Sequence, residues 1–178
     1  MISRFELFVV LRAQVRDRAL LRRALAKEAV CGALAGSVGA DAELWALAGL
    51  GADIDAVLTA ENPLRRGAVA EELLRAEGLP DEAAAAARAC RCDAPELLSP
   101  LARGLVVADT LVDAFLAAEE PIADLTPAHL SLPLAKAARR GDPGAERALV
   151  CLGLLGLDVD AAAAAALEGL RAAAEDLA

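Results

Sequence analysis

The clearest shortage in this 178-residue sequence is of aromatic side chains and histidine. Tyrosine is absent, and one tryptophan, three phenylalanines and one histidine are all that remain of these types. Proteins that bind single-stranded nucleic acid stack bases on aromatic rings and hold phosphates with positive charge. This chain instead has a net charge of -9, which repels polyanions at long range. We therefore expect no nucleic acid among its partners.

Long uncharged runs are also missing, although 57% of the residues are hydrophobic. The longest stretch without a charged side chain is residues 29–40, and residues 148–157 form another such stretch. A helix needs about 20 apolar residues to cross a bilayer. The N-terminus also lacks the basic region, apolar core and small-residue cleavage site of a secretory signal. The sequence predicts no membrane association and a cytoplasmic location.

The four cysteines do not form a recognisable motif. Cys90 and Cys92 are separated by one residue, which is neither the CxxC spacing of redox proteins nor a zinc-binding spacing. A chain of this length can build a hydrophobic core without disulfide bonds. We expect four free thiols, most of them buried.

The sequence is rich in alanine and in signals that start and stop helices. Capping side chains, several followed by proline in the first helical turn, precede apolar stripes of helical spacing. The predicted helix starts include Ser3 (with Glu6 as a capping box), Asp41, Ser99, Thr126, Ser131, Asp142 and either Asp158 or Asp160. No segment alternates apolar and polar residues convincingly over the length of a strand. The sequence predicts an all-α fold of about nine closely packed helices, forming one domain over residues 1–178.

One stretch, residues 44–55, is an apolar helix that ends on two carboxylates, Asp53 and Asp55. It resembles the motif-bearing helix of HD-domain proteins, an all-helical superfamily of metal-dependent phosphohydrolases. In that family the helix closes with a His-Asp pair that binds the metal. Asp53 stands at the aspartate position here, and Ala52 stands at the histidine position.

The resemblance extends over most of the chain and is strongest between residues 24 and 109. It places the family's first histidine position on Arg23, the histidine that precedes a loop glycine on Arg66, and a later helix-closing histidine on Cys90. The final metal-binding aspartate is retained as Asp109, at the end of the matching segment that begins Ser99-Pro100-Leu101. The resemblance implies an HD-domain-like helical bundle.

The same resemblance implies a metal-dependent catalytic centre, but this chain lacks the histidines that bind the metal in the family. HD-domain enzymes use imidazoles and carboxylates to hold divalent ions that activate a water molecule. The only histidine, His129, lies outside every matching segment. Asp53, Asp109 and a thiol are too few ligands for a hard cation and lack the imidazoles that a softer one prefers. We expect no catalytic residue, no metal and no cofactor; the alternative is a divalent metal such as manganese or iron.

Arg23 and Arg66, which stand at histidine positions, suggest what has replaced the metal. Two guanidinium groups supply about the charge of one divalent ion, and arginine can bind a carboxylate through two parallel hydrogen bonds. A buried carboxylate without a cation costs several kcal/mol. We therefore predict that these arginines pair with Asp53 and Asp109.

Other interpretations of the same residues stay open at this point. The two arginines, each preceded by another arginine, could be ordinary solvated helix faces, or they could hold an anion such as phosphate. Asp53 and Asp55 could be simple helix caps. Glu71-Glu72 is expected to be a solvated helix face, and His129 a surface or packing residue.

These observations favour a catalytically inactive HD-domain-like protein that acts as a binding, regulatory or structural module. The candidate partners are a small anionic ligand and a second copy of the chain. The alternative function, implied by the resemblance, is a metal-dependent phosphohydrolase acting on a small phosphorylated or nucleotide substrate.

Overall fold

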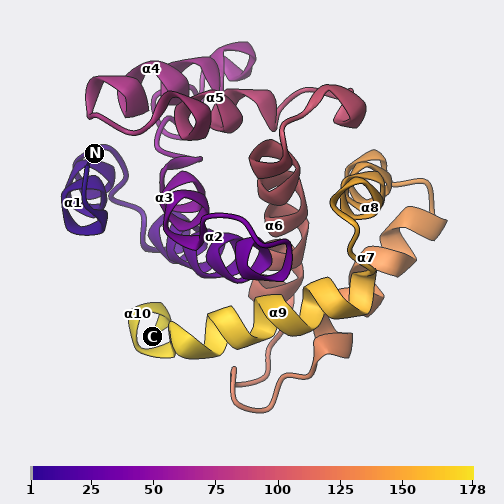
Figure 1. The fold of residues 1–178 in the computed structure, drawn as a ribbon. Coiled ribbons are helices and arrows are strands. Elements are labelled where there is room, and N and C mark those ends of the chain that lie inside the picture. The colour runs from indigo at the N-terminus through magenta and orange to yellow at the C-terminus, as the bar shows by residue number, and fades with distance from the viewer. Residues whose placement is uncertain (1) are drawn as a thin grey trace.

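The computed structural model describes residues 2–178, and these residues form helices joined by turns, with no strand among them (Figure 1). The α-helices are α1 (Arg4–Gln14), α2 (Arg18–Ser37), α3 (Ala42–Gly51), α4 (Ala68–Ala76), α5 (Asp81–Ala89), α6 (Pro100–Ala117), α7 (Pro127–Arg139), α8 (Pro143–Leu155), α9 (Val159–Ala172) and α10 (Ala174–Leu177). Two short 3-10 helices, η1 (Pro63–Arg65) and η2 (Pro95–Leu97), lie in the connections. The predicted all-α helical bundle is confirmed.

Most helices begin where a capping side chain stands in the sequence. Ser3 and Glu6 form the predicted capping box at α1. The side chains of Asp41, Ser99 and Asp158 accept hydrogen bonds from the first turns of α3, α6 and α9. Each bond satisfies a backbone N–H that has no partner within its own helix.

The predicted helix start at Ser131 is wrong. Thr126 and Pro127 have already started α7, and Pro133 lies inside that helix with its side chain exposed. A proline in a helix interior removes one backbone hydrogen bond. Leu130 and Leu134 on either side are buried, so the packing of this apolar face carries the helix through the proline.

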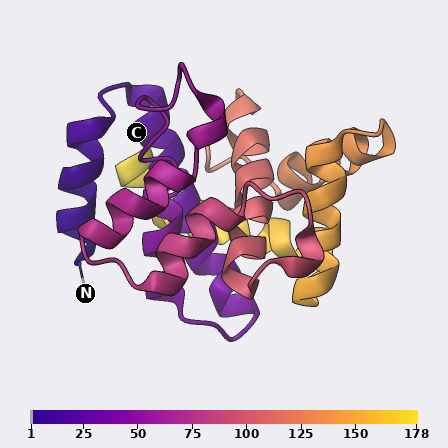
Figure 2. The same ribbon diagram turned by 90° about the horizontal axis from the view of Figure 1, so that it is seen from above.

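Helix α2 lies at the centre of the molecule. It packs against α3, α9 and α6, while α4 and α5 form a layer that covers one end of the bundle (Figures 1 and 2). Helices α7 and α8 pack on the far side of α6. The long helices α2 and α6, which lie against each other, bring together side chains that are about 80 to 90 residues apart in sequence.

Glycines allow the helices around α2 to approach its backbone directly. A Cβ atom at Gly49 of α3 would lie 2.6 Å from the carbonyl oxygen of Lys27. A Cβ atom at Gly169 of α9 would lie 2.5 Å from the carbonyl oxygen of Ala29. Both distances are too short for any side chain, so each glycine sets how closely its helix packs on α2.

The cysteines are unbonded, as the sequence predicts: Cys31, Cys90 and Cys151 are buried and Cys92 is exposed. In the part of the chain that the structure describes, no single helix is long and apolar enough to span a membrane. Helices α8 and α9, which meet at 93°, meet the criteria of length and composition only when they are taken together.

Candidate functional site

A cluster of charged side chains lies where α2, α3 and α6 meet. Asp53 follows the end of α3 and is 5% exposed, and Asp109 lies in the middle of α6. On α2, Arg23 and Lys27 are four residues apart and therefore point from the same face of the helix toward these carboxylates. Local helix geometry thus delivers two cations and two anions to one place.

The ammonium group of Lys27 lies between the two aspartates. Its Nζ atom is 2.6 Å from Asp53 Oδ2 and 2.8 Å from Asp109 Oδ1, and its side chain is 1% exposed. A buried ammonium is tolerated only when it is paired and hydrogen-bonded. Lys27 is therefore held as a cation that bridges two carboxylates.

Three arginines complete the cluster. Arg23 Nη2 is 2.7 Å from Asp109 Oδ1, and its Nη1 contacts Asp113 one turn further along α6. Arg66 Nη2 and Arg91 Nη2 both approach Asp53 Oδ1, at 2.8 and 2.6 Å. The ion pairs expected for Arg23 and Arg66 are thus present, and neither arginine is a free solvated side chain.

The charges fix the protonation of the cluster. Burial by itself would raise the pKa of Asp53, but Lys27 and Arg91 outweigh it and hold that pKa well below its ordinary value. In the same way Lys27 and Arg23 lower the pKa of Asp109 to about 2, against burial and the nearby charge of Asp53. Burial would lower the pKa of Lys27, yet the two aspartates raise it. Both carboxylates and the ammonium are charged at neutral pH.

Asp55 positions the cluster without belonging to it. Its fully buried carboxylate accepts hydrogen bonds from the backbone N–H groups of Gly67, at 2.7 Å, and Ala70, at 3.1 Å. It therefore caps α4 from the turn region that follows α3. Gly67 has a φ of +84°, a conformation that favours glycine. Because Arg66 directly precedes Gly67, this contact fixes the point from which Arg66 reaches Asp53.

Two of the predicted site residues make no polar contact with the cluster. Ala52 is buried and has no functional group. Cys90 is buried, its Sγ donates a hydrogen bond to the carbonyl of Ala87, and burial raises the pKa of its thiol. A neutral thiol is a weak ligand and a weak nucleophile. His129 lies away from the cluster, where its Nδ1 accepts a hydrogen bond from the backbone N–H of Thr126.

Lys27, Arg91 and Asp113 are the members of the cluster that the sequence did not point to. Lys27 lies four residues after Arg23 in the same helix, in a segment that is otherwise largely apolar. That position was a usable signal. Arg91 had none, because only the folded chain brings the end of α5 back to Asp53.

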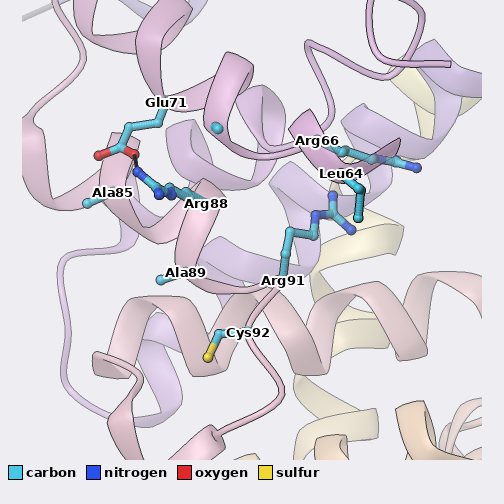
Figure 3. A pocket seen from close by; sticks show the side chains of 9 residues that line it. Leu64, Arg66, Glu71, Ala85, Arg88, Ala89, Arg91 and Cys92 are labelled. Carbon is cyan, nitrogen blue, oxygen red and sulfur yellow. Dashed lines mark hydrogen bonds and ion pairs between the residues drawn. The ribbon is translucent and has the colours of Figure 1, made fainter. Parts of the chain in front are cut away.

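A cavity of about 500 Å³ opens beside the cluster, between α4 and α5 (Figure 3). Arg66 and Arg91 lie on one side of it, and Arg88 lies on the other. The Nε atoms of Arg66 and Arg91 are buried and have no hydrogen-bond partner among residues 2–178. These two guanidinium groups share Oδ1 of Asp53, and Arg91 Nη1 also lies 3.6 Å from Asp109 Oδ2, so part of their capacity to donate hydrogen bonds is unused.

Glu71, which also lines this cavity, corrects the prediction of a solvated helix face. The residue is 9% exposed, and its carboxylate lies 2.9 Å from Arg75 Nη2 and 3.3 Å from Arg88 Nη1. Helices α4 and α5 pack against each other here and cover it. Its neighbour Glu72 is exposed, as expected.

The residues of the cluster do not fit a divalent metal ion. Within residues 2–178, no three histidine, cysteine or acidic side chains gather with the geometry of a metal site. Lys27 Nζ occupies the point between Asp53 and Asp109 from which an ion would contact both.

Comparisons of the chain with protein-family models, with curated proteins and with solved structures found no match.

Proposed function

We propose that the chain is a catalytically inactive domain of the HD type, which serves as a binding or regulatory module. The observation that carries the proposal is the position of Lys27 Nζ between Asp53 and Asp109. By the resemblance, these two aspartates are the ones that bind metal in the family. An ammonium group held between them replaces the charge of an ion but offers no coordination site.

The chemistry of the cluster supports the loss of hydrolysis. A phosphohydrolase of this type needs a metal ion that lowers the pKa of a bound water. Lys27 cannot accept a proton, since its pKa is raised. Asp53 is a poor general base, because its pKa is far below neutral. None of these groups can activate water at neutral pH.

The neighbouring cavity supports a binding role. The cluster contains four cations (Arg23, Lys27, Arg66 and Arg91) and three carboxylates (Asp53, Asp109 and Asp113), which leaves one positive charge in excess. Arg66, Arg91 and Arg88 line the cavity next to this charge. Guanidinium groups are well suited to the oxygens of a phosphate or carboxylate. We assign a small anionic ligand to this cavity.

The first experiment measures metal content and turnover together. Protein purified without an affinity tag or chelator is incubated with manganese, iron, zinc, nickel or magnesium, and the metal retained per chain is measured after gel filtration. Hydrolysis of p-nitrophenyl phosphate and nucleoside triphosphates is followed in parallel. We expect far less than one ion per chain and no turnover. About one tightly held ion with metal-dependent turnover would overturn the proposal in favour of a phosphohydrolase.

The second experiment tests the ligand. Inorganic pyrophosphate is titrated while thermal unfolding is monitored, because a ligand of the native state raises the melting temperature. We expect a rise that is reduced in Arg88→Gln, whose side chain is 66% exposed and whose partner Glu71 is also paired with Arg75. Arg65→Gln, which removes a charge next to Arg66 but outside the cavity lining, is the control and should behave like the parent chain.

A further inference from the structure

Positive charge is concentrated near the start of this acidic chain. Residues 4–27 contain seven of its 18 basic side chains but only two acidic ones, Glu6 and Asp17. Three of the seven, Arg4, Arg23 and Lys27, take part in ion pairs described by the structure. The other four are Arg12, Arg16, Arg18 and Arg22. They form no ion pair within residues 2–178, and the cluster described above uses none of them.

The fold collects these four arginines around one cavity of about 480 Å³. The end of α1, the first turns of α2 and the end of the chain after α9 meet here (Figure 2). Phe8, Leu21, Leu25 and Leu177 also line the cavity and give it an apolar floor. The volume is that of a small-molecule site, and the lining combines an apolar surface with a few charged groups, as such sites usually do.

The acidic groups nearby do not neutralise the arginines. Asp176 lines the cavity, but its carboxylate is 2.8 Å from Arg4 Nη2. Asp17 accepts hydrogen bonds from the backbone N–H groups of Ala19 and Leu20, and so caps α2. Even if a carboxylate at Ala178 is counted with Asp176, four positive groups face two negative ones. An anion in the cavity would meet an excess of positive charge.

Two of the arginines are held in place by aromatic rings. The guanidinium carbon of Arg12 lies 5.9 Å from the centre of the Phe8 ring, and that of Arg22 lies 5.3 Å from the centre of the Phe115 ring. Arg22 Nε also donates a hydrogen bond to the carbonyl of Leu177 at 3.1 Å. A guanidinium stacked on a ring keeps its in-plane N–H groups available. Such a preorganised donor loses little entropy when an anion binds.

We propose that this cavity binds a small amphiphilic anion, in which a phosphate or carboxylate group is joined to an apolar body. The arginines at the rim would hold the anionic group, and the apolar floor would cover the body. The proposal is independent of the cluster at Asp53, because Arg22 faces this cavity while Arg23 faces the cluster.

Three probes test separately whether the arginines bind the anionic group and whether the apolar residues bind the apolar body. Binding of 1-naphthyl phosphate, inorganic phosphate and 1-naphthol to the full chain is measured by isothermal titration calorimetry. We expect 1-naphthyl phosphate to bind at least about tenfold more tightly than either other probe, since only it engages both the rim and the floor. Equal binding of 1-naphthyl phosphate and inorganic phosphate would overturn the role of the apolar floor.

Variants locate the site. Arg16→Gln/Arg18→Gln removes two exposed rim charges that make no ion pair, and it leaves the two stacked arginines in place. We expect it to weaken 1-naphthyl phosphate binding about tenfold. Arg139→Gln/Arg140→Gln removes the same charge from an exposed helix end elsewhere and should change nothing. An equal loss in both double variants, or a loss only in Arg88→Gln, would overturn the assignment of this cavity.

Discussion

Arg22 and Arg23 are neighbours on α2, but their side chains lie in different environments. Arg23 contacts the carboxylates of Asp109 and Asp113, and its side chain is 20% exposed. Arg22 has no acidic partner among the described residues and stacks on an aromatic ring at the edge of an open cavity. Consecutive residues of a helix point about 100° apart. One turn of α2 therefore serves an internal network of paired charges and an external surface of unpaired ones.

The comparison shows that the role of a positively charged side chain depends on whether a carboxylate is paired with it. In the cluster each positive group is paired with a carboxylate, although Arg66 and Arg91 also line the neighbouring cavity and keep unused N–H donors. In the cavity lined by Arg12, Arg16, Arg18 and Arg22, which we call the arginine-lined cavity, the guanidinium groups have no acidic partner among the described residues. The two regions should respond differently to substitution, to pH and to ligands.

The largest effect is expected from removing the charge of Asp53, the carboxylate that four cations approach. In Asp53→Asn the four cations of the cluster (Arg23, Lys27, Arg66 and Arg91) face each other with one negative charge fewer. We expect a loss of about 3–5 kcal/mol in the free energy of unfolding, as is typical when one partner of a buried pair is removed. Urea denaturation measures it.

Asp113→Asn is the matched control, because it removes an aspartate of the same network that is 65% exposed. We expect it to cost less than about 1 kcal/mol. Similar small losses in the two variants would mean that burial does not govern the strength of the cluster.

Acid should weaken the cluster before it affects the arginine-lined cavity. The pKa of Asp109 is about 2 in the folded chain, against an ordinary value of 3.8, and that of Asp53 is also lowered. The unfolded chain therefore takes up protons at a higher pH than the folded one. The stabilisation is complete above about pH 4 and is lost as the pH falls toward 2. Urea unfolding at steps from pH 5 to pH 2 should record this loss.

The variant Asp109→Asn isolates the contribution of the cluster from that of other carboxylates. It lacks one of the two titrating groups, so its stability should fall less steeply between pH 4 and pH 2 than that of the parent chain. Parallel curves for the two proteins would contradict the assignment of the acid sensitivity to this site.

The smallest of these effects compares the two neighbouring arginines directly. Arg23→Gln removes charge-assisted hydrogen bonds to two aspartates, and we expect a cost of about 2 kcal/mol. Arg22→Gln removes the stacking on Phe115 and a hydrogen bond to a backbone carbonyl, and we expect about 0.5–1 kcal/mol. Equal costs, measured by the shift in the urea midpoint at constant slope, would show that the ion pairs of Arg23 add nothing.

The sequence predicted the parts of the fold that depend on local signals. A capping side chain and its helix lie within three residues of each other, so Ser3 and Ser99 could be recognised as helix starts without the fold. Ser131 led to a wrong prediction because a local signal does not report tertiary packing. Its local start signal competed with an apolar face of α7 that packs on the rest of the bundle, and the packing prevailed.

The site was predicted in part, and the missing part is tertiary. The resemblance was enough to predict that Arg23 and Arg66 pair with Asp53 and Asp109, and both arginines do so. No local pattern indicated that Arg91 returns to Asp53 from 38 residues away. Lys27 was overlooked because a lysine in a helix is usually solvated, and its burial depends on the close approach that Gly49 permits.

Because Lys27 is buried, the rate at which its amine reacts with a reagent reports how often the molecule opens. The chain has only two lysines, Lys27 and the exposed Lys136. An amine-reactive reagent should modify Lys136 at once, and Lys27 only when α2, α3 and α6 separate. The slow rate of labelling at Lys27, followed by mass spectrometry, would therefore report how often the centre of the bundle opens under native conditions.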